Sequence, residues 1–396
     1  MLRMEARVSE LPSTSGNTED LQAWALLVRS PSLDRERLLP ALTAAGSAAA
    51  LTHASSAQLA HWQLPARAIE YLRAPDRAAV EQDLQWLAAA PGRHLVPLDS
   101  PLYPPLLHQS VGAPVALYVR GVPSVLCLPQ LAMVGSRNPT ASGREAAFQF
   151  ARHLAGCGLA ITSGLAVGID SASHRGALAA QQPTIAVCGC GLDTVYPAEN
   201  ASLAAEIELT GALLSEFPPG TPPLRENFPQ RNRIISGLAL GTLVVEAASR
   251  SGSLITARFA LEQGREVFAI PGSIHSPLSR GCHQLIRQGA KLVETGDDVL
   301  AELGVIAAAA AASPAREQAR RRAASGGVAA GELDKEYEIL LDALGFDPLG
   351  VDALVERSGL KPDAVASMLL ILELQGAIEA HPGGRYCRRP GPVTRA

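Results

Sequence analysis

Short apolar segments alternate with stretches of helix length between residues 131 and 303, and this alternation limits the fold more than any other feature. Short strands that are apolar throughout are typical of a mostly parallel sheet buried under crossover helices. The sequence therefore predicts an α/β fold with a Rossmann-like, doubly wound, mostly parallel sheet. The predicted strands are residues 131–134, 159–162, 184–188, 212–215, 243–246, 266–270 and 290–293.

Two smaller domains and a linker complete the predicted organisation. Before the sheet, apolar residues recur at spacings of three and four, which predicts a small all-α domain. After the sheet, an alanine-rich segment of low complexity predicts a linker. Three helix-like segments and a hairpin with its turn at Gly383 and Gly384 then predict a winged-helix-like domain. The predicted boundaries are 1–95 for the helical domain, 96–304 for the Rossmann-like domain, 305–332 for the linker and 333–396 for the winged helix.

The overall charge is weakly negative, −4 over 396 residues, so the chain as a whole does not attract nucleic acid. A nucleic-acid site would have to be a local basic patch. The first 20 residues are polar and charged, and no run of eighteen apolar residues occurs, so we expect a cytoplasmic protein with no membrane contact. The six cysteines lack the spacing of metal ligands or of a disulfide framework, and we expect neither a metal nor a cofactor.

Polar clusters follow nearly every predicted strand. In an open parallel sheet, ligands bind at the carboxyl ends of the strands, where helix N-termini point backbone N–H groups outward. The cluster at residues 135–140 combines a glycine, hydroxyls, an amide and the guanidinium of Arg137, which suits a phosphate group. We therefore predict that several loops form one anion site. Its candidate residues on these loops are Gly135, Ser136, Arg137, Asn138, Gly164, Gly189, Asn200 and Ser253.

The most distinctive cluster places Arg231, Asn232 and Arg233 just before the apolar pair at residues 234–235. This order predicts an exposed turn ahead of a buried helix, with both arginines free to contact a nucleic-acid backbone. Phe228 or Tyr196 would be a stacking platform for a base. Packing against the sheet is the alternative for either aromatic side chain, and a surface ion pair is the alternative for the arginines. The acidic partners for such a pair are Glu216, Glu226 and Glu246.

Several enzyme classes are excluded by missing motifs. No Gly-Lys pair occurs, so the chain lacks a phosphate loop of the ATPase type. The segment 189–194 lacks the third glycine of the dinucleotide-binding fingerprint, which argues against a nicotinamide enzyme. Neither HExxH nor GxSxG is present. The residues therefore demand neither covalent nor metal chemistry.

Five motifs closely resemble the DNA-processing protein A (DprA/Smf) family over about residues 96–303. They are GSR at 135–137, ITSGLAVGIDSASHRGAL, GCGLDTVYPAEN, SEFPPGTPPLRENFPQRNRIISGL and VVEAASRSGSLITARFALEQGREVFAIPG. The resemblance implies a single-stranded-DNA-binding mediator of natural transformation. Such a protein protects incoming DNA, promotes loading of RecA recombinase onto DNA covered by single-strand-binding protein, and works as a homodimer through its Rossmann-like domain. By the same resemblance, residues 135–137 hold backbone phosphate and residues 231–233 belong to the same basic pocket.

Two other functions remain as alternatives. The architecture is also similar to that of lysine-decarboxylase-like phosphoribohydrolases, which hydrolyse nucleoside monophosphates. In that case Glu246 or Asp170 would act as an acid or base, although the PGGxGTxxE type of motif is missing because Ser273 follows Pro271 and Gly272. The other alternative is a winged-helix transcription regulator with a ligand-sensing core.

Overall fold

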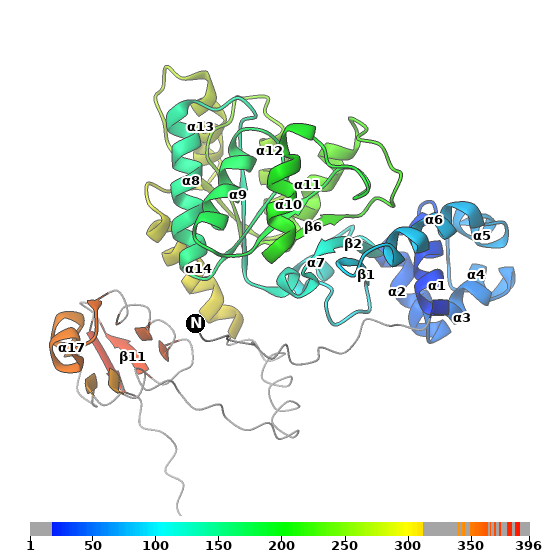
Figure 1. The fold of residues 1–396 in the computed structure, drawn as a ribbon, viewed down its shortest axis with the longest axis horizontal. Coiled ribbons are helices and arrows are strands. Elements are labelled where there is room, and N and C mark those ends of the chain that lie inside the picture. The colour runs from blue at the N-terminus through cyan, green and yellow to red at the C-terminus, as the bar shows by residue number, and fades with distance from the viewer. Residues whose placement is uncertain are drawn as a thin grey trace, which may run out of the picture. The chain divides into compact units, whose positions relative to one another are not determined.

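A nine-stranded sheet lies at the centre of the first unit of the computed structural model, within the described residues 18–311 (Figure 1). Its order is β1-β2-β6-β5-β4-β3-β7-β8-β9. All neighbouring pairs from β6 to β9 are parallel, whereas β1 and β2 are antiparallel to their neighbours. The strands are β1 (Arg93–Pro97), β2 (Ala116–Gly121), β3 (Gln130–Val134), β4 (Ala160–Ser163), β5 (Thr184–Val187), β6 (Ala212–Ser215), β7 (Gly241–Val244), β8 (Glu266–Ala269) and β9 (Lys291–Leu292).

The chain divides into two units, residues 1–308 and 309–396, each with its own contacts. The structure describes residues 18–311 without a break. In the second unit it describes residues 339–340, 343–344, 349–362, 365, 368–369, 372–373, 378–381 and 385–388. Most of the predicted linker therefore lies outside the described residues, except that 305–311 belong to the helix α14 (Gly296–Ala311).

The predicted α/β class is confirmed, since each of the seven predicted strands corresponds to one strand from β3 to β9. The strand β7 begins at Gly241, two residues earlier than predicted, because Gly241 and Thr242 already pair with β3. The prediction missed β1 and β2. The first of these is half-polar, with Arg93 and His94 at its start, so it lacks the fully apolar pattern of the parallel strands.

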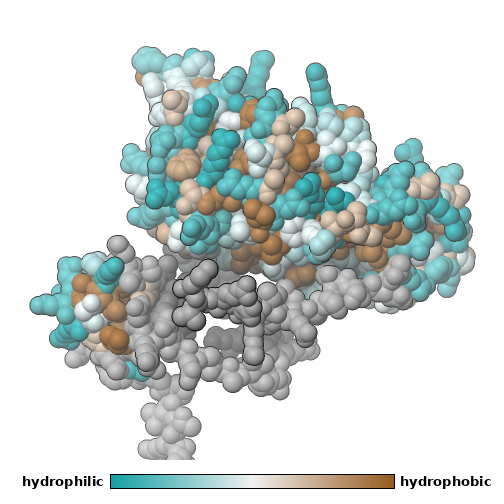
Figure 2. All heavy atoms as spheres, in the orientation of Figure 1, coloured by the Kyte–Doolittle hydropathy of each residue, from teal (hydrophilic) through white to brown (hydrophobic). Residues whose placement is uncertain are grey.

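Helices cover both faces of the sheet, and alternate residues of a strand point to opposite faces. On β3, Leu131 and Met133 pack with one apolar cluster, and Ala132 and Val134 pack with the other. In Figure 2, teal hydrophilic residues on the visible face of the described part of the chain are interspersed with white and brown patches. The helices of the sheet region are α7 (Pro105–His108), α8 (Ala141–Gly156), α9 (Ile169–Ala179), α10 (Ala201–Thr210), α11 (Asn227–Leu238), α12 (Ser253–Glu262), α13 (Arg280–Arg287) and α14.

The strand order places a topological switch at β3. From β3 the chain continues through β4, β5 and β6 on one side and then crosses to β7 on the other side of β3. The loops after β3 and β7 therefore leave in different directions, which opens a crevice at the carboxyl ends of these strands. This position is where a doubly wound sheet binds its ligand.

The N-terminal residues 18–88 form a helical bundle, as predicted, and a buried ion pair joins its first and last helices. Arg29 of α1 donates to both oxygens of Asp83 on α6, at 2.6 and 2.7 Å. The Tyr118 hydroxyl of β2 donates to the same carboxylate at 3.0 Å. Asp83 and Tyr118 are fully buried, so this network connects the bundle to the sheet. The bundle helices are α1 (Thr18–Arg29), α2 (Arg35–Ala45), α3 (Ala48–His53), α4 (Ser56–His61), α5 (Ala66–Arg73) and α6 (Arg77–Ala88).

The second unit contains a small three-stranded sheet, in the order β10-β12-β11, and its own apolar cluster around Leu354. The predicted hairpin is present, because β11 pairs with β12 in antiparallel register, whereas its turn lies outside the described residues. The elements are β10 (Leu349–Gly350), α17 (Val351–Ser358), β11 (Ile378–His381) and β12 (Arg385–Arg388). Of the described residues in both units, no helix is long and apolar enough to cross a membrane.

Replacement of Asp83 by alanine should strongly destabilise the first unit. The change leaves the half-buried guanidinium of Arg29 and the fully buried hydroxyl of Tyr118 without their acceptor, which costs about 1–3 kcal/mol. Urea unfolding followed by circular dichroism measures the effect. Glu262→Ala is the control, since its pair with Arg258 is exposed and contributes about 0.5 kcal/mol. Equal stability of the two variants would show that the buried network contributes no more than a surface pair.

Candidate nucleic-acid interface

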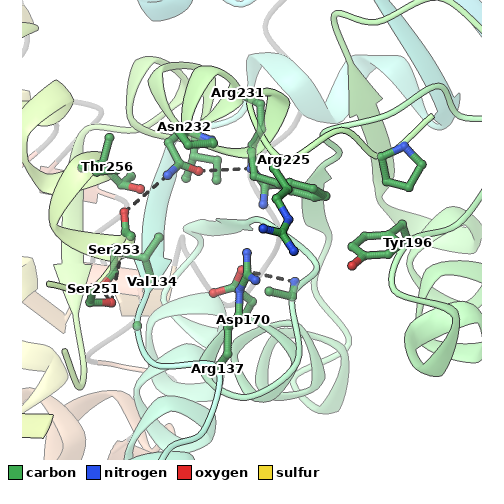
Figure 3. Close-up of a pocket in the computed structure, with 18 residues that line it drawn as sticks. Val134, Arg137, Asp170, Tyr196, Arg225, Arg231, Asn232, Ser251, Ser253 and Thr256 are labelled. Atoms are coloured by element: carbon green, nitrogen blue, oxygen red, sulfur yellow. Dashed lines mark hydrogen bonds between the residues drawn. The ribbon is translucent and has the colours of Figure 1, made fainter. Parts of the chain in front are cut away.

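A cavity of about 780 Å³ opens at the carboxyl ends of the parallel strands, at the topological switch (Figure 3). Loops after five strands, β3 to β7, contribute to its walls, together with the first turns of α11 and α12. The lining residues are Val134, Gly135, Arg137, Ala166, Asp170, Tyr196, Pro223, Arg225, Phe228, Pro229, Arg231, Asn232, Ile235, Ser251, Gly252, Ser253, Ile255 and Thr256.

Hydrogen bonds to Glu246 fix the loop after β3. The Glu246 carbonyl accepts from the Ser136 N–H at 2.7 Å, and its carboxylate accepts from the N–H and the hydroxyl of Thr140 at 2.9 and 2.6 Å. Thr140 in turn caps α8 by accepting from the Gly143 N–H. Arg137 is exposed above this clamped loop, so its guanidinium is held near the cavity and remains available to a ligand.

Gly135 is required by close packing at the start of the same loop. A Cβ atom there would lie 2.7 Å from the Ile169 side chain and 3.0 Å from the Glu246 carbonyl oxygen. The glycine thus lets the loop pass directly over α9, and it places the following residues at the mouth of the cavity.

The side chain of Arg231 is buried in the floor of the cavity and is not exposed at its rim. Its Nη1 donates to the carbonyl of Val187, at the end of β5, and to that of Gly164, just after β4, the latter at 2.8 Å. Its Nε donates to the Asn232 side chain at 3.1 Å. The side chain is only 4 % exposed, and this burial lowers the pKa of its guanidinium. Arg231 therefore ties two strand ends together and presents only part of its guanidinium to the cavity.

Asp170 is the buried acid beside Arg231. Its Oδ2 accepts from the N–H groups of Gly164 and Ala166 at 3.2 and 3.3 Å. Burial raises the pKa of Asp170, and the positive charge of Arg231 opposes that shift. Both acids of the hydrolase alternative, Asp170 and Glu246, thus already accept hydrogen bonds from backbone N–H groups. In the part of the chain that is described, no cluster of histidine, cysteine and acidic residues could hold a metal ion.

Phe228 forms the centre of an aromatic and cationic group. The guanidinium carbons of Arg137 and Arg231 each lie 5.9 Å from the centre of its ring. The ring of Tyr196 lies 5.4 Å away, inclined by 43°. A Cβ atom on Gly189 would lie 2.9 Å from the Phe228 ring, so this glycine makes room for it. Cations this close to an aromatic face are attracted by its quadrupole, which helps to orient both arginines.

The opposite wall is polar but uncharged. Ser251 and Ser253 share a hydroxyl hydrogen bond of 2.7 Å, and the Asn232 amide donates to the Gly252 carbonyl at 3.4 Å. Thr256 also lines this wall, one turn into α12. In Figure 3 these residues face Arg137 and Arg225 across the cavity. The cavity therefore has one cationic and aromatic side and one side of hydroxyl and amide groups.

Half of the predicted site residues line this cavity. They are Gly135, Arg137, Phe228, Arg231, Asn232 and Ser253. Ser136, Asn138, Gly164 and Gly189 lie in the loops that shape it, where the Asn138 N–H donates to the Ser136 hydroxyl. Asn200 has an internal role, because its buried amide donates to the Leu165 carbonyl at 2.8 Å and to the Ser171 hydroxyl at 2.9 Å.

The prediction that Arg233 belongs to the basic pocket is not supported. Arg233 forms an ion pair with Glu216, one of the partners considered from the sequence, and does not line the cavity. The reason is that residues 227–238 form the helix α11 and not an exposed turn. Two positions apart on a helix, Arg231 and Arg233 point in nearly opposite directions. Burial raises the pKa of Glu216, and the charge of Arg233 opposes that shift.

Arg225 was missed by the sequence analysis. It is exposed, lines the cavity and lies on the loop between β6 and α11. This loop is attached at its middle, where the Gly220 N–H donates to Asp193 at 2.8 Å and the Gly191 N–H donates to the Thr221 carbonyl at 2.9 Å. The sequence feature that could have indicated it is an arginine in a proline-containing segment three residues before Phe228.

Replacement of Arg231 by methionine should destabilise the fold more than replacement of Arg137. Without Arg231, the carbonyls of Gly164 and Val187 and the buried Asp170 lose a donor or a counter-charge, which costs about 3–5 kcal/mol. Arg137→Met alters an exposed side chain and should change stability by less than about 0.5 kcal/mol. Denaturant unfolding of both variants measures this difference. If Arg231→Met unfolds at the same denaturant midpoint as the wild type, the hydrogen bonds of Arg231 do not stabilise the strand ends.

Comparison with known proteins gives a family for this arrangement. Residues 94–304 match the family model described as DNA recombination-mediator protein A, and residues 326–384 match the DprA winged helix domain, which confirms the predicted winged helix. The chain is 45 % identical to Protein Smf of Escherichia coli over 309 residues, 78 % of this chain and 80 % of that protein.

A sequence match and a structure match to proteins of Streptococcus pneumoniae agree with this family. The chain is 50 % identical over 200 residues to its DNA processing protein DprA, covering 50 % of this chain and 71 % of that protein. The X-ray structure of DNA processing protein A from this organism matches with a TM-score of 0.63 and 38 % identity, over 71 % of this chain and 97 % of that one. On the match over residues 94–304 and the similarity along most of its length, this chain belongs to the DNA-processing protein A (DprA/Smf) family.

Proposed function

We propose that this chain binds single-stranded DNA in the cavity at the topological switch and acts there as a recombination mediator in natural transformation. The observation that carries the proposal is the convergence of Arg137, Arg225 and Arg231 on one cavity, with Arg137 and Arg231 beside the ring of Phe228. The chain has a net charge of −4, so this cavity concentrates positive charge on a protein that otherwise repels DNA. Such a site attracts a phosphodiester backbone.

Each wall of the cavity fits part of a nucleic-acid strand. The guanidinium groups of Arg137 and Arg225 suit phosphate oxygens, to which arginine donates two hydrogen bonds at once. The hydroxyl and amide groups of Ser251, Ser253 and Asn232 suit the remaining phosphate and sugar oxygens. None of these contacts reads the edge of a base, so we expect binding with little sequence preference.

We also propose that the protein is not an enzyme. Hydrolysis of a glycosidic bond needs an acid or base that can approach the substrate. The Asp170 carboxylate accepts from two backbone N–H groups, and the Glu246 carboxylate accepts from the N–H and the hydroxyl of Thr140. Their hydrogen bonds favour a structural role for both carboxylates, in line with the absence of a hydrolase motif in the sequence.

The proposed partners are RecA recombinase, single-strand-binding protein and a second copy of this chain, in the cytoplasm. The proposal of RecA loading and of protection of incoming DNA rests on membership of the family. For the homodimer, a groove of about 300 Å³ lies between α12 and α13 and offers a surface for association. Leu261 is 52 % exposed there, and the groove also contains Leu254, Ile255 and Leu285. An exposed apolar surface of this kind favours association.

Arg137→Ala and Arg225→Ala should weaken binding to a single strand and reduce its salt dependence. Each lost phosphate contact lowers the slope of log K against log salt concentration by about 0.7. Fluorescence anisotropy with a labelled oligonucleotide over a salt series measures both quantities. Arg67→Ala on α5 is the matched control, because it removes the same charge from an exposed position outside the cavity. If all three variants bind like the wild type, the cavity is not the DNA site.

RecA loading should depend on the same cavity. On strands covered by single-strand-binding protein, the wild type should shorten the delay before RecA hydrolyses ATP, because it brings the strand to RecA. The variant Arg137→Ala should lose this effect while Arg67→Ala keeps it. If Arg137→Ala shortens the delay as much as the wild type does, RecA loading does not depend on DNA binding in the cavity.

A further inference from the structure

One aromatic side chain at the edge of the cavity remains largely open. Tyr196 is 45 % exposed, although it lines the cavity and lies against Phe228. Phe228 itself is half-buried and already has Gly189, Tyr196 and two guanidinium groups as neighbours. An aromatic ring without neighbours on its outer face is available to an incoming planar group, and of these two rings Tyr196 has the more open surface.

A second apolar group lies on the neighbouring loop. Tyr196 follows β5, and Pro223 and Leu224 follow β6, the adjacent strand of the sheet. Pro223 lines the same cavity as Tyr196, and Leu224, next along the chain, is 44 % exposed. The position of Leu224 is set by two backbone hydrogen bonds, from its N–H to the Pro222 carbonyl at 2.9 Å and from the Asn227 N–H to its own carbonyl at 3.2 Å.

The same loop connects these apolar residues to the cationic side of the cavity. Arg225 directly follows Leu224, and Figure 3 shows its guanidinium between Tyr196 and Arg137. A nucleotide unit presents the same arrangement, a planar base next to a charged phosphate. Apolar and aromatic side chains beside a phosphate-binding arginine are therefore suited to one base of the strand that the arginine holds.

We propose that Tyr196, together with Pro223, forms a stacking surface for an unstacked nucleobase of the strand whose phosphates lie against Arg137 and Arg225. The inference rests on the proposed binding of DNA in this cavity. It adds the reason for a preference for single strands, because the arginines alone would hold any phosphodiester. In a duplex both faces of each base are covered by neighbouring bases, so the surface would select a strand that is already unpaired.

The test compares two ligands of equal length and charge, an oligothymidylate and a strand in which every site is abasic. Wild-type protein should bind the first more tightly. Tyr196→Ala should weaken binding to oligothymidylate by about 5- to 150-fold, the range for loss of one stacked base, and leave binding to the abasic strand unchanged. Tyr196→Phe should bind like the wild type, because stacking needs the ring and not the hydroxyl.

A matched control separates this effect from a general loss of apolar surface. Leu209→Ala alters a side chain that is 77 % exposed at the end of α10 and does not line the cavity, so it should bind both strands like the wild type. If Tyr196→Ala weakens binding to both strands equally, or weakens binding to neither, the proposed stacking surface is wrong. It is also wrong if the wild-type protein binds the two strands with equal affinity. If the wild type binds neither strand, the proposed DNA binding itself fails.

Discussion

The buried guanidinium of Arg231 is the contact on which the cavity depends. Parallel strands β4 and β5 lie side by side in the sheet, where Val187 ends β5 and Gly164 directly follows β4. Arg231 donates to Gly164 and Val187 from the next layer, so the ends of the strands are joined by a side chain of α11. A charge so fully buried needs several acceptors and a nearby opposite charge, and the carbonyls and Asp170 supply both. The loop after β4 and the end of β5, which form the floor of the cavity, are thereby fixed relative to one another.

Glycines make this arrangement possible where the backbone must come close to the buried charges. A Cβ atom on Gly164 would lie 2.5 Å from Arg231 Nη2 and 2.8 Å from Asp170 Oδ2. A Cβ atom on Gly143 would overlap the carboxylate of Glu246, at 2.3 Å from its Cδ. The two acids of the site thus hold the loops after β3 and β4, while Arg137 and Arg225 are exposed at the cavity. Asp170 also lines the cavity, but the neighbouring Arg231 offsets its charge, so the cavity keeps its attraction for phosphate.

The sequence predicted the sheet well because its strands are short, apolar and separated by crossover helices, a pattern that depends only on burial. It also singled out Gly135, Arg137 and Ser253, which line the cavity, since glycines and helix starts mark the segments after β3 and β7. It could not predict that residues 227–238 are helical from their first turn, because a segment with Pro229, two arginines and an asparagine is equally typical of a turn. Because the segment is helical, the rotational position of each residue around the helix axis decides which of the two arginines reaches the cavity. That position cannot be read from the identity of single residues.

Arg225 shows a second limit of the sequence. Whether a loop arginine reaches a site depends on contacts from distant segments, and here Asp193 and Gly191 hold the loop after β6 through its backbone. The sequence gives no indication that residues some thirty positions apart meet. Arg225 and Pro223 both line the cavity, so the loop brings a charge and an apolar side chain to it together. A protein with no overall attraction for DNA can bind a strand through such a site only if several groups act at once. Phosphate contacts weaken as salt rises, whereas base stacking weakens far less, so a site with both keeps part of its affinity when the charges are screened.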